Sequence, residues 1–250
     1  MEFFDDIYCI NLYDRIDRYN SSKKLFKKYN IPVKYYHTHK HPKGGLHGCF
    51  ESHINVINLA YNSGAKNVLI FEDDIQDCNQ DVNRIKINLK KAINFMKNKT
   101  WDIFYLGTFP YVMKKGTSLV YEHSNIYEMV GLCTHAYVIN HHIMKKLKDL
   151  KYSGTPYDYL LRDNFRCFSI YPSIFYQGNF SSDISKYMDI HKIIRFDIVL
   201  LWVKINEIYA YYIGVPILNL SLLLLLLLFI LMVICFICNK NYGRRTIINI

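Results

Sequence analysis

The sequence lacks a concentrated basic segment, although its charge is strongly positive. Its 31 Lys and Arg residues and 21 Asp and Glu residues give a formal net charge of +10, but the basic residues are spread along the chain. Nucleic-acid-binding arms gather Lys and Arg in one stretch, so we expect no nucleic-acid partner. The excess positive charge instead suits phosphate groups or an anionic membrane surface.

The seven cysteines lack the spacing of a metal site or of a disulfide framework. Their number is odd, and only Cys235 and Cys238 lie close together in the sequence. Zinc modules use closely spaced pairs of cysteines, and small secreted domains use even sets. The cysteines therefore require neither zinc nor an oxidising compartment.

A secretion signal is also missing from the beginning of the chain. Residues 1–6 are acidic and lead directly into a predicted strand. Signal peptides begin with a basic segment that is followed by an apolar stretch. We therefore expect no signal peptide.

In contrast to the rest of the chain, residues 217–238 form one long apolar run. These 22 residues carry no charge, and residues 222–228 are all leucine. At about 1.5 Å per residue, a helix of this length spans roughly 33 Å, which is enough to cross a bilayer core. We predict a transmembrane helix over residues 216–238, an amphipathic segment on membrane lipids over residues 191–215, and a short basic tail over residues 239–250.

The orientation of this membrane anchor involves two opposing signals. Lys240, Arg244 and Arg245 follow the apolar run, and basic residues favour the cytoplasmic side of a membrane. That orientation would place the preceding domain in the ER or Golgi lumen, which requires a signal peptide that we do not find. We therefore expect a C-terminal anchor with the domain in the cytosol, and the lumen is the alternative.

The hydrophobic pattern of residues 7–171 alternates between strands and helices. The predicted strands carry short apolar runs and cover residues 7–12, 33–36, 68–74, 103–106, 134–139 and 168–171. The predicted helices carry apolar residues at helical spacing and contain residues 25–29, 50–61, 82–96, 143–147 and 157–165. This alternation predicts an α/β domain over residues 1–190, with a parallel or mixed sheet and flanking helices.

Three carboxylates, Glu72, Asp73 and Asp74, end the most apolar of these strands. The strand is predicted to be buried on both faces, and open α/β sheets bind ligands at the carboxyl ends of such strands. Adjacent like charges are unfavourable unless a positive group shares the site, and a divalent cation with a phosphorylated ligand would meet that need. In the alternative, the residues form a polar turn in which Asp73 or Asp74 caps the next helix.

Two further segments offer groups for an anionic ligand. In residues 11–18, at the same sheet edge, Arg15 and Arg18 suit a phosphate or a ribose, and Asp17 suits the orientation of one of them. A solvated helix start is the alternative for this segment. Residues 45–53 open a helix with two glycines, which permit close backbone approach, and with free amides, which attract anions. A flexible loop is the alternative there.

Histidines alternate at positions 37, 39 and 41. In an extended loop only alternate side chains share a face, and no cysteine or second cluster completes a metal site in the sequence. We therefore do not expect a zinc site in this loop.

In this order, the polar segments resemble glycosyltransferase family 25, the family of lipooligosaccharide and collagen galactosyltransferases. The resemblance covers about residues 7–185. The matching segments are Ile10–Leu12 with Arg15, Asp17 and Arg18, then Gly45, Gly48–Cys49 and Ser52–His53, then Phe71–Asp74, Trp101–Asp102, Tyr105–Gly107, Ala136–Ile139, Pro156–Asp158, Ile170–Pro172 and Ser182–Ser185. The resemblance implies a glycosyltransferase A-type, Rossmann-like fold, a UDP-linked sugar donor, and inversion at the anomeric carbon.

The resemblance also implies roles for the matching residues. The acidic motif would hold Mn²⁺ or Mg²⁺ against the donor diphosphate, with Asp74 as a direct ligand and Asp183 as a further metal contact. The residues expected at the donor are Asn11, Arg15, Asp17, Arg18, Gly48, Ser52, His53, Glu72 and Asp73. The acceptor hydroxyl must lose a proton, and we expect Asp158 to accept it, with Asp102 as the second candidate.

Together these features predict a membrane-anchored glycosyltransferase. It would move a hexose such as galactose from a UDP-sugar to a glycan, lipid-linked or protein acceptor. The alternative is a catalytically inactive relative that binds a glycan or a nucleotide sugar. A metal-dependent phosphoryl-transfer enzyme acting on nucleic acid is not expected, because it would require a second carboxylate cluster and a concentrated basic surface.

Overall fold

The computed structural model describes residues 2–77, 82–113, 125–171, 173–178 and 180. The chain divides into two units, Met1–Arg195 and Phe196–Ile250, and every described residue lies in the first. The predicted anchor over residues 216–238, its flanking segments and Asp183 lie outside the described residues. Among the helices that are described, none is long and apolar enough to span a membrane.

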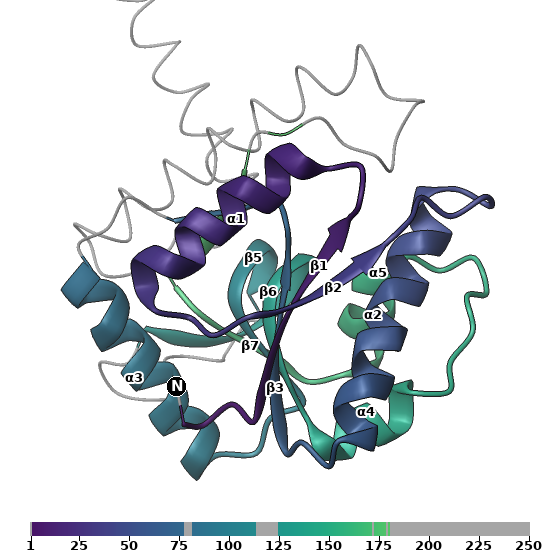
Figure 1. Ribbon diagram of the computed structural model, residues 1–250. Coiled ribbons are helices and arrows are strands. Elements are labelled where there is room, and N and C mark those ends of the chain that lie inside the picture. The colour runs from purple at the N-terminus through teal and green to yellow at the C-terminus, as the bar shows by residue number, and fades with distance from the viewer. Residues whose placement is uncertain (1, 78–81, 114–124, 172, 179, 181–250) are drawn as a thin grey trace, which may run out of the picture. The chain divides into compact units, whose positions relative to one another are not determined.

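Within these residues, strands and helices alternate as the hydrophobic pattern predicts (Figure 1). The strands are β1 (Asp6–Leu12), β2 (Lys34–Thr38), β3 (Asn67–Glu72), β4 (Ile75–Asp77), β5 (Ile103–Met113), β6 (Ile126–Asn140), β7 (Cys167–Ile170) and β8 (Phe175–Gln177). The helices are α1 (Ile16–Tyr29), α2 (Gly45–Asn62), α3 (Val82–Asn98), α4 (His141–Leu147) and α5 (Tyr157–Asn164). The α/β class is therefore confirmed.

Six of the described strands form one mixed sheet in the order β2-β1-β3-β6-β5-β7. β1 is parallel to β2 and β3, whereas β6 is antiparallel to β3 and β5. β7 is parallel to β5 and antiparallel to the first residues of β6. A mixed sheet with flanking helices is what the sequence predicts, and it is confirmed.

Two short strands, β4 and β8, are not predicted by the hydrophobic pattern. They form a separate antiparallel pair in which Ile75 is opposite Gln177 and Asp77 is opposite Phe175. Strands of three residues are too short to show an alternating pattern, and these two partners are far apart in the sequence. β4 begins directly after Asp74, so this pair fixes the direction in which the chain leaves the acidic residues.

Helices cover both faces of the main sheet. α1 and α3 pack on one face, and α2, α4 and α5 pack on the other (Figure 1). Along β3, Leu69 and Phe71 belong to the core under α1 and α3, whereas Val68 and Ile70 belong to the core under the other three helices. All four side chains are at most 1% exposed, so β3 is buried on both faces as predicted.

The β5–β6 hairpin is longer and less regular than the sequence predicts. Both strands extend beyond the predicted ranges 103–106 and 134–139. Gly107 interrupts the apolar pattern of β5 because nothing larger fits there. A Cβ at Gly107 would lie 2.4 Å from the carbonyl oxygen of Phe175. The apolar sequence pattern that predicts β5 therefore stops at Gly107, where close packing requires glycine.

The parallel strands β1 and β3 bring polar residues together at one edge of the sheet. Ile10 of β1 is paired with Glu72 of β3, so Asn11 and Asp73 follow side by side. β6 lies on the other side of β3, and its residues before Ala136 reach the same edge. Three segments that are distant in the sequence therefore meet where β3 ends.

Candidate active site

Asp73 is held by one side chain from β1 and one from α1. Its Oδ2 accepts a hydrogen bond from Asn11 Nδ2 at 2.7 Å, and its Oδ1 accepts one from Arg18 Nη1 at 3.0 Å. Burial raises the pKa of Asp73, although the Arg18 guanidinium opposes this rise. Because each of its oxygens has a donor, Asp73 connects the end of β3 to both β1 and α1.

Asp74 is buried, and one of its oxygens has no partner. Its Oδ2 accepts a hydrogen bond from Gln177 Nε2 at 3.1 Å and lies 3.4 Å from Arg18 Nη1. Its Oδ1 is buried without a hydrogen-bond partner among the described residues. Burial and the neighbouring Glu72 carboxylate raise the pKa of Asp74 to about 7. A buried carboxylate oxygen without a donor is unfavourable, and a bound cation would satisfy it.

Glu72 begins a chain of side-chain contacts that runs from β3 through α2 to α5. Its Oε1 accepts hydrogen bonds from Thr134 Oγ1 at 2.7 Å and from His53 Nε2 at 3.3 Å. His53 Nδ1 lies 3.0 Å from the Tyr137 hydroxyl, which lies 2.9 Å from the Tyr157 hydroxyl. Burial raises the pKa of Glu72, but the contacts with His53 and Thr134 outweigh burial and lower it to about 2. Glu72 is therefore ionised at neutral pH.

A bulge in β6 aims Thr134 at Glu72. Residues 133–135 of β6 lie opposite a single residue of β5, because the pairing shifts register there. Cys133 has a φ of 67°, which is uncommon for a residue other than glycine, and its amide donates a hydrogen bond to Asp158 Oδ2 at 3.2 Å. The bulge thus joins the start of α5 to the part of β6 that contacts Glu72.

The two predicted proton acceptors, Asp158 and Asp102, lie at opposite ends of the sheet. Asp158 is beside the β6 bulge, near the acidic cluster. Asp102 precedes β5, whose first residue is paired with Ile139 near the other end of β6. There Asp102 Oδ2 accepts a hydrogen bond from the amide of Arg166 at 3.0 Å. The strand directions thus separate Asp102 from the acidic cluster, and we do not keep it as a second candidate for the base.

The two arginines after β1 have different partners. Arg15 is 8% exposed and makes a two-point contact with Asp17, from Nε to Oδ1 at 3.0 Å and from Nη2 to Oδ2 at 2.8 Å. This hydrogen bonding is the main cause that lowers the pKa of Asp17 to about 2. Arg18 lies instead against Asp73 and Asp74. Arg18 is therefore the arginine at the acidic cluster, whereas Arg15 shapes the turn.

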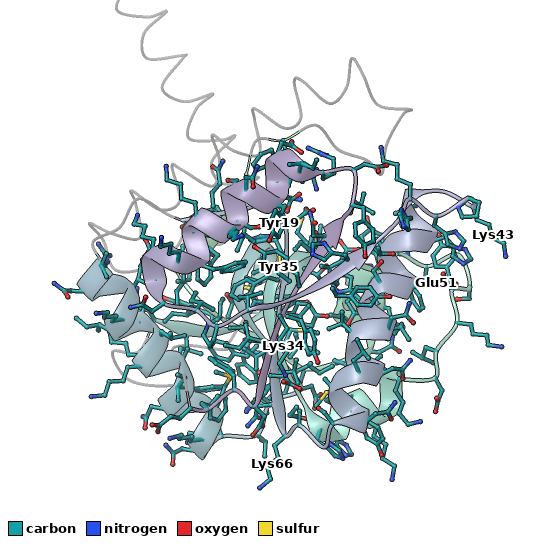
Figure 2. The ribbon with its side chains drawn as sticks, in the orientation of Figure 1. Tyr19, Lys34, Tyr35, Lys43, Glu51 and Lys66 are labelled. Carbon is teal, nitrogen blue, oxygen red and sulfur yellow. The ribbon has the colours of Figure 1, made fainter. Side chains whose placement is uncertain are left out.

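An aromatic surface beside Asn11 was not identified from the sequence. The Tyr13 ring stacks on His37 and His39, with centroids 5.1 and 4.6 Å apart, and Tyr13 is 53% exposed. His37 Nδ1 lies 3.0 Å from Asn11 Oδ1. Tyr35, labelled in Figure 2, also stacks on His37, at 5.6 Å. The alternating histidines are the sequence signal of this surface, which offers a flat face to a heterocyclic ligand.

The hydrogen bonds of Gly48 and Ser52 are made with residues at the start of the same helix, α2. The Gly48 amide donates to the Gly44 carbonyl at 3.1 Å, and the Ser52 hydroxyl donates to the Gly48 carbonyl at 2.6 Å. A Cβ at Gly48 would lie 2.8 Å from the Cβ of His41. Glycine is therefore required at position 48 because the preceding loop packs on the helix. Of the predicted α2 residues, the structure brings His53 to the acidic cluster through Glu72.

Two groups of described side chains have ligand atoms close enough to share a metal ion. They are Cys49, His53 and Glu72 in one group, and His41, His47 and Glu51 in the other, with ligand atoms within 4.8 Å in each. In the first group, burial and the Glu72 carboxylate raise the pKa of Cys49 well above its usual range, so the thiol stays protonated. The carboxylates of Asp74 and Glu72 are therefore the better match to a hard cation such as Mn²⁺ or Mg²⁺.

Comparison with protein families identifies one match over most of the described region. The family described as Glycosyltransferase family 25 (LPS biosynthesis protein) matches residues 2–161. A comparison with curated protein sequences gave no match.

Solved structures share part of the architecture at low identity. A197 from STIV is 10% identical with a TM-score of 0.44, and the match covers 68% of this chain and 83% of that chain. A glycosyltransferase involved in the glycosylation of the major capsid of PBCV-1 is 12% identical with a TM-score of 0.42, and the match covers 70% of this chain and 96% of that chain. Both TM-scores are too low to carry an argument about this chain.

Proposed function

This chain belongs to glycosyltransferase family 25 and is a glycosyltransferase, and we propose that its acidic cluster binds the diphosphate of a nucleotide-sugar donor through a divalent cation. A hexose such as galactose would pass from UDP to a hydroxyl of a glycan, lipid-linked or protein acceptor, with inversion at the anomeric carbon. The mixed sheet, with its acidic cluster at the end of a central parallel strand, supports assignment to the glycosyltransferase A-type fold.

One observation carries the proposal: the buried Oδ1 of Asp74 has no hydrogen-bond partner among the described residues. The surroundings of this oxygen fit a hard divalent cation, because the ionised Glu72 carboxylate lies two residues before Asp74 and both side chains offer oxygen ligands. Mn²⁺ or Mg²⁺ held by Asp74, with Glu72 in support, would supply Lewis-acid stabilisation of the departing diphosphate. Asp183, the further predicted ligand, lies outside the described residues. Asp73 is assigned to positioning, because it connects Asn11 of β1 to Arg18 of α1.

The residues around the cluster suit the rest of a nucleotide donor. Arg18 adds positive charge next to Asp74, where a diphosphate would carry its negative charge. The aromatic surface of Tyr13, His37 and His39 would stack against the base, and Asn11 connects this surface to Asp73. In this arrangement the base of the donor would stack on the aromatic surface, and the charge of its diphosphate would be neutralised at the acidic cluster. The two contacts together would hold the anomeric carbon in a fixed position.

Asp158 is proposed as the base that accepts the proton of the acceptor hydroxyl. Inversion requires a base on the face of the sugar opposite the leaving group, and a carboxylate within hydrogen-bond reach can accept the proton. The oxygens of Asp158 accept hydrogen bonds from the backbone amides of Cys133 and Tyr159, at 3.2 and 3.0 Å. These bonds orient the carboxylate and leave lone pairs free on its oxygens.

Residues 216–238 are proposed as a membrane anchor, with the catalytic domain on the cytosolic side. The support is the uncharged run in the sequence. The sequon Asn98-Lys99-Thr100 tests the orientation, since Asn98 is exposed at the end of α3. We expect no glycan on Asn98 after expression in a eukaryotic cell, and glycosylation there would place the domain in the lumen.

The proposed function is tested with the full-length chain in detergent, incubated with a panel of nucleotide sugars and Mn²⁺. We expect one UDP-sugar to be consumed with release of UDP, loss of this activity on addition of a chelator, and recovery when Mn²⁺ or Mg²⁺ is restored. Donor binding without turnover would support the inactive relative instead. If the folded chain neither binds nor consumes any donor, the proposal fails.

A further inference from the structure

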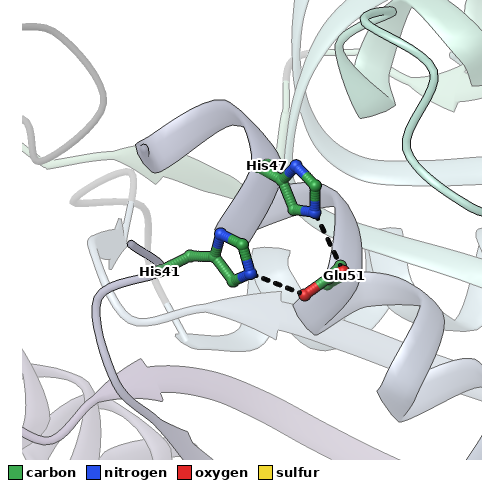
Figure 3. Close-up of side chains that lie close together, drawn as sticks. All are labelled: His41, His47 and Glu51. Atoms are coloured by element: carbon green, nitrogen blue, oxygen red, sulfur yellow. Dashed lines mark hydrogen bonds and ion pairs between the residues drawn. The ribbon is translucent and has the colours of Figure 1, made fainter. Parts of the chain in front are cut away.

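A second group of metal-ligating side chains lies where the loop after β2 meets α2. Figure 3 shows His41 and His47 both directed at the carboxylate of Glu51. His41 Nε2 lies 3.2 Å from Glu51 Oε2, and His47 Nε2 lies 2.9 Å from Glu51 Oε1. His47 and Glu51 are one turn apart on α2, which places them on one face of the helix.

The distances between these ligand atoms are close to those of a tetrahedral zinc site. Zinc binds imidazole nitrogen at about 2.0–2.1 Å and carboxylate oxygen at about 2.0–2.2 Å, so neighbouring ligands in a tetrahedron lie roughly 3.4 Å apart. The two nitrogen–oxygen distances, 3.2 and 2.9 Å, end at different oxygens of Glu51. With one ligand atom taken from each residue, the three atoms lie within 4.8 Å of one another, and side-chain rotations would bring them to the separation that zinc requires. Two imidazoles and one carboxylate suit zinc, whereas Mg²⁺ and Ca²⁺ prefer oxygen ligands.

The cluster is reachable from solvent and leaves room for a fourth ligand. The side chains of His41 and His47 are 22% and 15% exposed, and that of Glu51 is 46% exposed. Three protein ligands and a solvent-facing position are the usual arrangement of an open zinc site, in which water completes the coordination.

The loop that carries His41 already packs on the helix that carries the other two ligands. The amide of Gly44, whose φ is 101°, donates a hydrogen bond to the His41 carbonyl at 3.0 Å. The rings of His41 and His47 are stacked with centroids 4.2 Å apart. The absence of a side chain at Gly48 lets His41 approach the first turn of α2. The backbone is therefore already in place, and zinc binding would require the two stacked rings to rotate, because each Nε2 lone pair lies in the plane of its ring.

We propose that His41, His47 and Glu51 bind one Zn²⁺ ion, which fastens residues 40–44 to α2. The inference is independent of the proposed function, because none of the three residues belongs to the acidic cluster. Figure 2 shows Glu51 and Lys43 at the end of α2 that is remote from Lys66. His39, which stacks on Tyr13, directly precedes the fastened segment, so zinc would also stabilise the aromatic surface.

Without metal, the three side chains satisfy one another. Each histidine Nε2–H donates to one oxygen of Glu51, and His41 Nδ1 accepts a hydrogen bond from the Lys43 amide at 3.1 Å. Binding of zinc at Nε2 moves the ring proton to Nδ1, so the Lys43 amide loses this acceptor. The metal-free, hydrogen-bonded cluster is thus the state with which zinc binding competes.

The test is a zinc titration of the full-length chain in detergent, without nucleotide sugar. Excess Mg²⁺ is present throughout, because it occupies sites with oxygen ligands and does not compete for imidazole. We expect one zinc per chain. His47→Ala should weaken zinc binding by at least about 100-fold, because even the loss of a second-shell partner costs 10–100-fold. Glu51→Gln should also weaken it, whereas His142→Ala, a change of an exposed histidine on α4, should have no effect.

Co²⁺ supplies a readout that does not depend on the folding of any variant. The parent chain with Co²⁺ should show the intense visible absorption of a tetrahedral site with nitrogen ligands, and added Zn²⁺ should abolish it. Weak, octahedral-type absorption, or zinc affinity that is the same in the parent and in folded His47→Ala, would overturn the inference. Because no donor is present, these outcomes are separate from success or failure of the glycosyltransferase assay.

Discussion

The two ends of the main sheet use the same polar residue types for different purposes. At the end where β3 begins, Asp5 and Asp102 accept hydrogen bonds from backbone amides. Asp5 Oδ2 accepts hydrogen bonds from the amides of Lys66 and Asn67 at 2.8 and 2.9 Å, and Asp102 Oδ2 accepts one from Arg166 at 3.0 Å. Such contacts close turns and hold loops in place.

At the end where β3 finishes, Asp73 and Asp74 accept hydrogen bonds from side chains of distant segments instead. Asp73 contacts Asn11 and Arg18, and Asp74 contacts Gln177. One buried oxygen of Asp74 has no hydrogen-bond partner among the described residues. The comparison teaches that a buried oxygen without a donor, rather than the presence of a carboxylate at a strand end, distinguishes the candidate cation site from a turn.

The largest expected effect comes from removal of the charge on Asp74. Asp74→Asn should lower the rate of sugar transfer by at least about 10³-fold, because Lewis-acid stabilisation of the leaving group is worth several kcal/mol. The matched control is Asp163→Asn, since Asp163 is an exposed carboxylate paired with Arg162. Steady-state rates of UDP release measure both variants. Equal losses in the two variants would contradict the assignment.

A second test contrasts the two carboxylates that the sequence offers as bases. Asp158→Asn should lower kcat by about 10²-fold or more with little change in donor KM, because general-base catalysis contributes at least that much. Asp102→Asn should leave kcat unchanged and lower the free energy of unfolding by about 1 kcal/mol, because the Arg166 amide loses a charged acceptor. Kinetics together with denaturant unfolding separate these effects. A larger kcat loss in Asp102→Asn would reverse the two assignments.

The smallest expected effect is a pH dependence of stability in the metal-free protein. The pKa of Asp74 is raised from 3.8 to about 7 in the folded protein, so the folded state keeps a proton that the unfolded state releases. The resulting stability is fully present below the ordinary pKa and is lost as the pH rises through about 7. Glu72, with its pKa lowered from 4.5 to about 2, contributes stability that is present above pH 4.5 and is lost as the pH falls from there through about 2.

Comparison with Asp74→Asn isolates this effect. Between about pH 5 and about pH 8, the free energy of unfolding of the parent should fall relative to the variant by on the order of 1 kcal/mol or more. Burial lowers the pKa of His135, so this residue makes the free energy of unfolding rise with pH, opposite to Asp74. This contribution is present in both proteins and cancels in the comparison. Denaturant unfolding in a chelating buffer measures the difference. Parallel pH curves for the two proteins would show that Asp74 does not hold the extra proton.

The elements closest to the acidic cluster were predictable because their patterns are local. β3 is a short apolar run, and both of its faces are buried, so periodicity and composition are enough to identify it. α2 carries Phe50, Ile54 and Ile57 at helical spacing, and these side chains enter the core under α2. The cap of α4 is also local, since Asn140 Oδ1 accepts a hydrogen bond from the Ile143 amide, three residues along the chain, at 3.1 Å.

The features that the sequence left open depend on pairings between distant segments. Asp102 and Asp158 both begin regular elements, and the strand directions alone place them at opposite ends of the sheet. The alternating histidines did not predict a metal site, because the sequence does not show that His41 meets His47 and Glu51 of the next helix. His37 and His39 turn instead toward Tyr13.

The sequence by itself determined the α/β class and the place of the acidic residues at the end of a buried strand. Both depend on the spacing of apolar side chains and on where it stops, which are properties of neighbouring residues. Only the tertiary structure decided that each oxygen of Asp73 has a donor while Asp74 keeps a buried oxygen without a partner among the described residues. Those states depend on side chains that approach from β1, α1 and β8, and such approaches are set by sheet order and packing rather than by local sequence.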